Sequence, residues 1–171
     1  MKKILKLYQN IDDKLSYLFS NNSNEKKLLK KFFNNKKITV IDVGSNLGNY
    51  LDFSIKNLNI KKIIAFEPSK ICFNYLKKKY KNRNKKKINK ALSNKEKNSN
   101  FYEKKILSQS SLYNKKNKFL KNNNNQSKYK IECTTLDLFH KKIKKKENFD
   151  LVKIDTEGED INVLKGCEFL I

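Results

Sequence analysis

The segment VIDVGSNLGNY carries residue types that suit the binding of a ligand against the backbone. Asp42 stands near the end of its apolar run, and Gly44 and Gly48 follow at the spacing D-x-G-x-x-x-G. Glycine permits a tight turn and a close approach of a ligand. Ser45 and Asn46 stand between the glycines, and the third glycine of a dinucleotide fingerprint is missing, so a pyrophosphate would be crowded. The turn therefore predicts contacts to a smaller, zwitterionic ligand.

A second candidate group, Glu67, stands at the end of the next apolar run, in the segment IIAFEPS. A carboxylate at this position accepts hydrogen bonds from both hydroxyls of a ribose and repels a 2′-phosphate. In this order, the glycine turn and Glu67 predict a nucleoside pocket without pyrophosphate contacts. S-adenosylmethionine is a cofactor that fits this description.

A parallel sheet is needed to bring these groups together. From Ile38 onward, β-rich apolar runs alternate with helical segments, which is the signature of βαβ units. The pattern predicts strands over 37–43, 62–66, 87–92 and 150–154, and helices over 47–58, after Pro68-Ser69 and over 159–167. Two short strands, over 100–103 and 129–134, flank a solvated loop at 114–128 that is rich in lysine and asparagine. We expect the glycine turn and Glu67 to face each other at the strand ends.

The order of these segments resembles that of one known family. VIDVGSNLGNY, IIAFEPS, NKALSN, SSLY, TTLDLF and FDLVKIDTEGEDINVLKG resemble the motif series of FkbM-type methyltransferases over residues 38 to about 168. The last segment is similar to the family's K-I-D-x-E-G-x-E-x-x-V-L-K-G block, with Asp160 in place of the usual glutamate. The resemblance implies an α/β fold, a Rossmann-like class I methyltransferase sheet with helices on both faces. It also implies methyl transfer from S-adenosylmethionine to a hydroxyl on a sugar, glycan or small metabolite.

The resemblance also assigns roles to the turn and to the strand that follows it. It implies that Asp42, Gly44, Asn46 and Gly48, with Ser45 between them, surround the methionine part of the cofactor. It places Glu67 at the ribose.

Further roles follow from the later motifs. Asn89, Ala91 and Leu92 would border the adenine. Asp155 would end the fourth strand beside the methyl group, so it is the candidate general base, and Glu157 is the second candidate. The alternative for Glu157 is an acidic residue that complements a helix dipole. We expect the side chain of Lys153 to reach from the face of the sheet to solvent, and we do not expect it to be catalytic.

The cysteines and the single histidine do not predict a metal site. Cys72, Cys133 and Cys167 lie far apart, and His140 has no neighbour at metal-ligand spacing, so no metal is expected. Scattered cysteines fit a reducing, cytoplasmic compartment and most simply pack as small apolar groups. His140 lies in a lysine-rich segment and is expected to be exposed. No apolar run approaches the roughly 18 residues of a transmembrane helix.

The net charge of +23 raises the question of a polyanionic partner. Arg83 is the one arginine among 40 basic residues, whereas base recognition and phosphate clamps favour arginine. Lysine, asparagine and isoleucine have A/T-rich codons, so compositional drift explains the excess equally well. We therefore expect a small-molecule or glycan acceptor and no specific nucleic acid. A lysine-rich nucleic-acid-binding module, or RNA methylation on the same fold, is the alternative.

The chain divides into a helical segment at 1–36 and a methyltransferase domain at 37–171. Apolar spacing from Ile4 to Leu18 predicts one N-terminal helix, and Leu28, Leu29, Phe32 and Phe33 predict a second. The family's sheet continues with a fifth strand and an antiparallel pair, so its last strands are expected to be missing here. The strand at 150–154 would then lie at an exposed edge. Either the sequence is a fragment or another chain completes the sheet, and the oligomeric state stays open.

Overall fold

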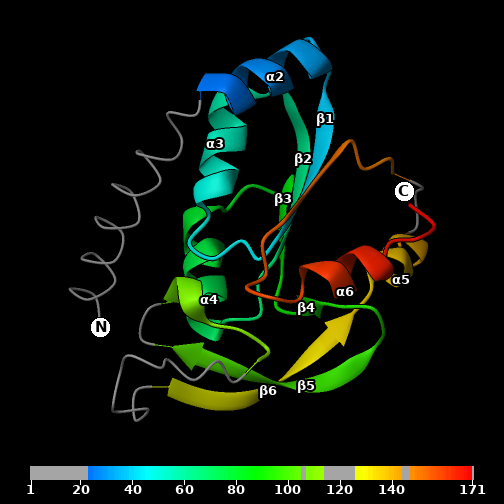
Figure 1. The fold of residues 1–171 in the computed structure, drawn as a ribbon. Helices are drawn as coiled ribbons and strands as arrows, with labels where there is room; N and C mark the ends of the chain where they lie inside the picture. Colours follow the sequence, from blue (N-terminus) through cyan, green and yellow to red (C-terminus); the bar gives the residue numbers. More distant parts are fainter. Residues whose placement is uncertain (1–22, 105–106, 114–125, 144–146, 171) are drawn as a thin grey trace.

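The computed structural model describes residues 23–104, 107–113, 126–143 and 147–170 (Figure 1). Its elements in chain order are α2 (Ser23–Phe33), β1 (Ile38–Val43), α3 (Asn49–Asn57), β2 (Ile60–Phe66), α4 (Lys70–Lys79), β3 (Lys85–Ile88), β4 (Ala91–Leu92), β5 (Lys97–Lys104), the 3-10 turn η1 (Leu107–Gln109), β6 (Gln126–Thr134), α5 (Leu136–Lys141), β7 (Leu151–Ile154) and α6 (Asp160–Lys165). The predicted helix between Ile4 and Leu18 lies outside the described residues.

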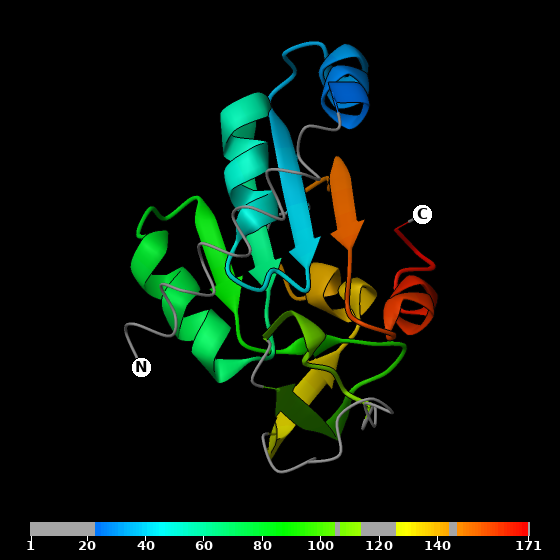
Figure 2. The same cartoon turned by 60° about the vertical axis from the view of Figure 1, so that its left-hand side comes forward.

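Four parallel strands form the central sheet in the order β3-β2-β1-β7. The helices α3 and α4 cover one face, and α5 and α6 lie on the other (Figure 1, Figure 2). Because both faces are covered, β1 is apolar on both sides. Ile38 and Val40 pack in the core on the side of α3 and α4, while Ile41 and Val43 pack against residues of α5 and α6. The predicted fold class, a parallel α/β sheet with helices on both faces, is confirmed.

A second, smaller sheet has the order β4-β6-β5, with β5 antiparallel and β4 parallel to β6. Figure 2 shows it beyond the ends toward which β1 and β7 point. The single strand predicted over 87–92 is wrong, because Ile88 ends β3 of the large sheet and Ala91 begins β4 of the small one. The small sheet thereby lies across the carboxyl ends of the parallel strands, where a ligand site is expected.

Several bounds differ from the predicted ones. β6 begins at Gln126, within the segment that was predicted to be a loop. The helix α5 was not predicted, because six residues are too few to show a helical period. It begins after Thr135, whose hydroxyl accepts a hydrogen bond from the amide of Leu138 at 3.0 Å. In α2, Phe33 is buried, whereas the predicted apolar residue Phe32 is 77% exposed.

β7 pairs with β1 and is an edge strand among the strands that the structure describes, as expected for the strand predicted at 150–154. Within the described ranges, no helix combines the length and the apolar character that crossing a membrane needs.

Candidate functional site

The turn after β1 has three residues in the left-handed region of the backbone. Gly44, Asn46 and Gly48 have φ angles of 78°, 46° and 88°. The amides of Gly44 and Ser45 both donate to the carbonyl of Phe66, at 3.0 and 3.2 Å. These bonds fix the turn against the end of β2. Asparagine tolerates this conformation better than most residues, which explains its place between the two glycines.

Packing against other parts of the chain explains why the turn uses glycine. A Cβ atom on Gly44 would lie 1.9 Å from the carbonyl oxygen of Asp155. A Cβ atom on Gly48 would lie 2.7 Å from the hydroxyl oxygen of Tyr80, which donates to the Gly48 carbonyl at 2.9 Å. The space beside the α-carbon of Gly48 is therefore filled by the side chain of Tyr80.

Glu67 follows β2 and reaches back to the turn. Its side chain is buried, with 5% of the residue exposed. One carboxylate oxygen accepts from the amide of Asn46 at 2.6 Å, and the other accepts from the amide of Ser69 at 2.7 Å. Burial raises the pKa of Glu67 from 4.5 to about 7, although these two amides act to lower it. The carboxyl group therefore changes its charge near neutral pH.

Asp42 and Lys153 form an ion pair beneath the turn. Asp42 is fully buried, and the amine of Lys153 lies 3.2 Å from its Oδ1. Burial raises the pKa of Asp42, and the charge of Lys153 opposes that rise. The same amine donates to the carbonyl of Gly44 at 3.1 Å and lies 3.7 Å from Oδ2 of Asp155. Lys153, expected to reach solvent, instead joins the turn to two carboxylates.

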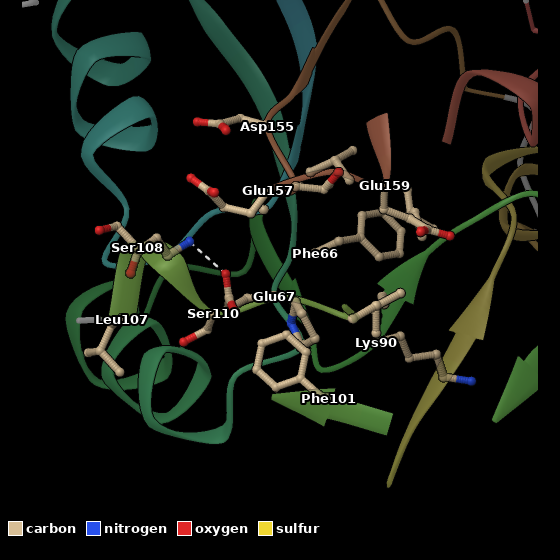
Figure 3. A pocket seen from close by; sticks show the side chains of 18 residues that line it. Phe66, Glu67, Lys90, Phe101, Leu107, Ser108, Ser110, Asp155, Glu157 and Glu159 are labelled. Carbon is tan, nitrogen blue, oxygen red and sulfur yellow. Dashed lines mark hydrogen bonds between the residues drawn. The ribbon is translucent and has the colours of Figure 1, made fainter. Parts of the chain in front are cut away.

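A cavity lies where the ends of β1, β2 and β7 meet the small sheet (Figure 3). Gly44, Asn46 and Glu67 line it on the side of the turn, and Asp155 and Glu157 line it after the end of β7. Its apolar lining includes Phe66, Ala91, Leu92 and Phe101. The cavity thus brings together the predicted glycine turn, Glu67 and the two candidate general bases, Asp155 and Glu157.

Comparison with known proteins decides the family. The model of the methyltransferase FkbM domain matches residues 42–171, the segment that carries the turn, Glu67 and the two carboxylates after β7. This chain belongs to the FkbM methyltransferase family. The crystal structure of methyltransferase FkbM from Methylobacillus flagellatus is similar in fold, with a TM-score of 0.53 and 14% identity. The match covers 79% of this chain and 30% of that one, so this chain spans less than a third of that protein. No curated protein matches.

Four residues that the FkbM motifs assign to the cofactor are not among those lining the cavity: Asp42, Ser45, Gly48 and Asn89. The hydroxyl of Ser45 donates to the carbonyl of Asp42 at 2.9 Å. The side-chain amide of Asn89 donates to the carbonyls of Glu67 at 2.8 Å and Pro68 at 3.0 Å. The side chains of Ser45 and Asn89 therefore hold the backbone that forms the wall of the cavity, and they are not part of its lining.

The loop after β5 supplies lining residues that motif analysis left without a role. Ser108 and Ser110 line the cavity, and Ser110 is the first serine of the SSLY segment that resembles the family's serine pair. The hydroxyl of Ser111 donates to the carbonyl of Glu157 at 3.1 Å. The serine pair therefore contributes one residue to the cavity and one bond that holds the chain after β7.

Glu159 is a further lining residue that the sequence did not single out. It is 3% exposed, and its carboxylate accepts from the hydroxyls of Ser93 at 2.5 Å and Tyr113 at 2.6 Å. Burial acts to raise the pKa of Glu159, but these donors outweigh it and the pKa is lowered. Its partners come from segments far apart in the chain, so no local pattern could have revealed this network.

The remaining candidates have structural surroundings. His140 is half-buried rather than exposed, because its Nε2 lies 2.9 Å from the carbonyl of Glu147 and its ring packs against Phe149. The three cysteines are buried, as predicted, and none of them is in a disulfide among the described residues. Among the residues that the structure describes, no three histidine, cysteine or acidic side chains gather as a metal site would require.

Proposed function

We propose that this chain binds S-adenosylmethionine and methylates a hydroxyl group on a sugar, glycan or small metabolite. The observation that carries the proposal is the single cavity shared by Gly44, Glu67 and Asp155. These residues come from the ends of three parallel strands, the position at which open α/β sheets bind ligands. Membership of the FkbM methyltransferase family supports the reaction class.

The lining residues fit the parts of this cofactor. Each oxygen of Glu67 accepts one backbone amide, and a carboxylate has further lone pairs for two ribose hydroxyls. Ala91 and Leu92 are both buried in the wall and offer an apolar border for adenine. The methionine end would lie against the turn at Gly44 and Asn46. Asn89 would hold this wall in place without contact to the cofactor.

The bound cofactor supplies a methyl group that is already activated by a positively charged sulfur. The chain itself has to orient the acceptor and accept the proton of its hydroxyl group. Asp155 is the proposed general base, since it lines the cavity while 68% of its side chain is exposed and can release a proton to water. Glu157, which lines the cavity close by in the chain, is the second candidate.

The charge of the cavity favours a small molecule or glycan over RNA as the acceptor. Lys90 is the one basic residue that lines the described cavity, and its amine pairs with Glu132 at 2.6 Å and points away (Figure 3). The other charged lining residues are the carboxylates of Glu67, Asp155, Glu157 and Glu159. A lining in which carboxylates outnumber lysines disfavours a phosphate here, even though the chain as a whole carries a charge of +23.

Titration calorimetry with S-adenosylhomocysteine tests the proposal. We expect binding to the wild type and its loss in Glu67→Ala, because the ribose hydroxyls lose their acceptor. Glu147→Ala is the matched control, since Glu147 pairs with Lys62 and does not line the cavity. Circular dichroism has to show that both variants remain folded. Absence of binding to the wild type, together with RNA binding that weakens steeply with salt, would favour the nucleic-acid-binding module instead.

A further inference from the structure

Glu103 is a buried acidic residue of the small sheet. It stands two residues after Phe101 in β5, so both side chains leave the strand on the same face. Phe101 is 2% exposed and lines the cavity (Figure 3), and Glu103 is 8% exposed. A buried carboxylate costs free energy unless hydrogen-bond donors compensate it. The position of Glu103 on this face therefore depends on specific partners.

The hydroxyl of Ser69 is one of these partners. It donates to Oε1 of Glu103 at 2.5 Å, and the hydroxyl of Tyr129 donates to the same oxygen at 3.0 Å. Ser69 is the N-cap residue of α4, and its hydroxyl oxygen accepts from the amide of Cys72 at 3.1 Å. Because a hydroxyl has a single hydrogen, the bond to Glu103 turns the lone pairs of Ser69 toward that amide. Glu103 therefore fixes the beginning of α4.

The backbone of Ser69 connects this contact to the cavity. Its amide donates to Oε1 of Glu67 at 2.7 Å, so Ser69 holds Glu67 with its amide and Glu103 with its hydroxyl. The other oxygen of Glu67 accepts from the amide of Asn46, in the turn after β1. One oxygen of Glu67 is thus fixed by the large sheet, whereas the other depends on a residue that the small sheet holds in place.

We infer that Glu103 is a positioning residue that, through Ser69, sets the orientation of Glu67 toward the ribose hydroxyls. This inference rests on the proposed function, in which Glu67 accepts the hydrogen bonds of a ribose. The same contact ties β5 to the beginning of α4, so it also holds Phe101 at the cavity. Glu103 itself does not line the cavity, so it acts on a ligand only through these neighbours.

The test measures the preference for ribose by calorimetry at pH 8, above the pKa of about 7 of Glu67. The two probes are S-adenosylhomocysteine and its 2′-deoxy analogue, which lacks one of the hydroxyls that Glu67 would accept. The wild type should bind the first probe roughly tenfold more tightly, the effect of one hydrogen bond to a charged group. Glu103→Met keeps a long side chain without an oxygen acceptor, and it should lower this ratio by at least about threefold.

Glu103→Gln is the conservative variant, because both donors bond to Oε1 and an amide oxygen can accept both of them. It should keep the ratio of the wild type. Glu147→Met, the same substitution at a carboxylate outside the cavity, should keep it as well. Should Glu103→Met fail to fold, Ser69→Ala decides, since it removes the hydroxyl but keeps the amide that bonds to Glu67. It should lower the ratio in the same direction.

A ratio that stays unchanged in Glu103→Met or in Ser69→Ala, with both affinities reduced equally, would indicate a purely structural role and overturn the inference. Equal affinities of the wild type for the two probes would overturn the inference and the role of Glu67 at the ribose, while the cofactor site stands. Absence of binding of S-adenosylhomocysteine to the wild type would overturn the proposed function itself.

Discussion

Replacing Glu67 with glutamine should raise the stability of the folded chain relative to the wild type as the pH increases from 4.5 to 8. Glu67 is buried, and burial raises its pKa to about 7, whereas a glutamate in the unfolded chain titrates near its ordinary value of 4.5. A carboxyl group with a raised pKa holds its proton more tightly in the folded state than in the unfolded state. Its contribution to stability is therefore present below pH 4.5 and is lost as the pH rises through about 7.

The displacement of the pKa from 4.5 to about 7 corresponds to about 3 kcal/mol of stability. Glutamine does not ionise, so it should lack this loss. It also places a donor against one of the two backbone amides that Glu67 accepts, which lowers the stability of the variant by an amount that does not depend on pH. The stability of Glu67→Gln relative to the wild type should therefore rise by about 3 kcal/mol between pH 4.5 and pH 8.

The assay is urea denaturation of the wild type and of Glu67→Gln at several pH values between 4.5 and 8.5. The difference between the two proteins is the relevant quantity, because the titration of all other groups contributes to both. Glu147→Gln serves as the control, since Glu147 lies outside the cavity in an ion pair with Lys62. A difference that stays constant with pH, or one in which the wild type gains stability as the pH rises, would refute the argument from burial.

Two further substitutions test the supports of the site. Gly44→Ala should destabilise the chain by more than about 2 kcal/mol in thermal denaturation, because the residue has a φ of 78° and an added methyl would lie 1.9 Å from a backbone oxygen; an unchanged midpoint would contradict the described packing. Lys153→Met should cost about 3 kcal/mol at pH 7 by leaving buried Asp42 without its cation, and less as the pH falls, because burial raises the pKa of Asp42 and the protonated acid needs no cation. Lys153→Arg, which keeps the charge, should retain most of the stability, and equal losses in both variants would argue against an electrostatic role.

Much of the large sheet could be predicted from local patterns. The runs that become β1, β2 and β7 are apolar, and the segments between them have helical spacing. Parallel strands connected in this way place their carboxyl ends at one edge. The meeting of Gly44, Glu67 and Asp155 in one cavity therefore follows from the order of the segments, although they lie far apart in the chain.

The small sheet could not be predicted in the same way. Ile88 and Ala91 look like parts of one strand, yet Asn89 and Lys90 carry the chain from one sheet to the other. That step depends on pairing with β6, which lies about forty residues later in the chain and supplies the partners of β4. No local signal describes such a distant pairing.

Residue types and spacing determined which strand ends carry polar groups, because turn chemistry and strand periodicity are local properties of the chain. Tertiary packing alone decided which of those groups reach the cavity. Gly48 and Asp42 belong to the same motif as Gly44, but Tyr80 fills the space beside Gly48, and Lys153 pairs with Asp42 beneath the turn. Both partners come from distant segments, and only the folded chain brings their side chains into contact with the motif.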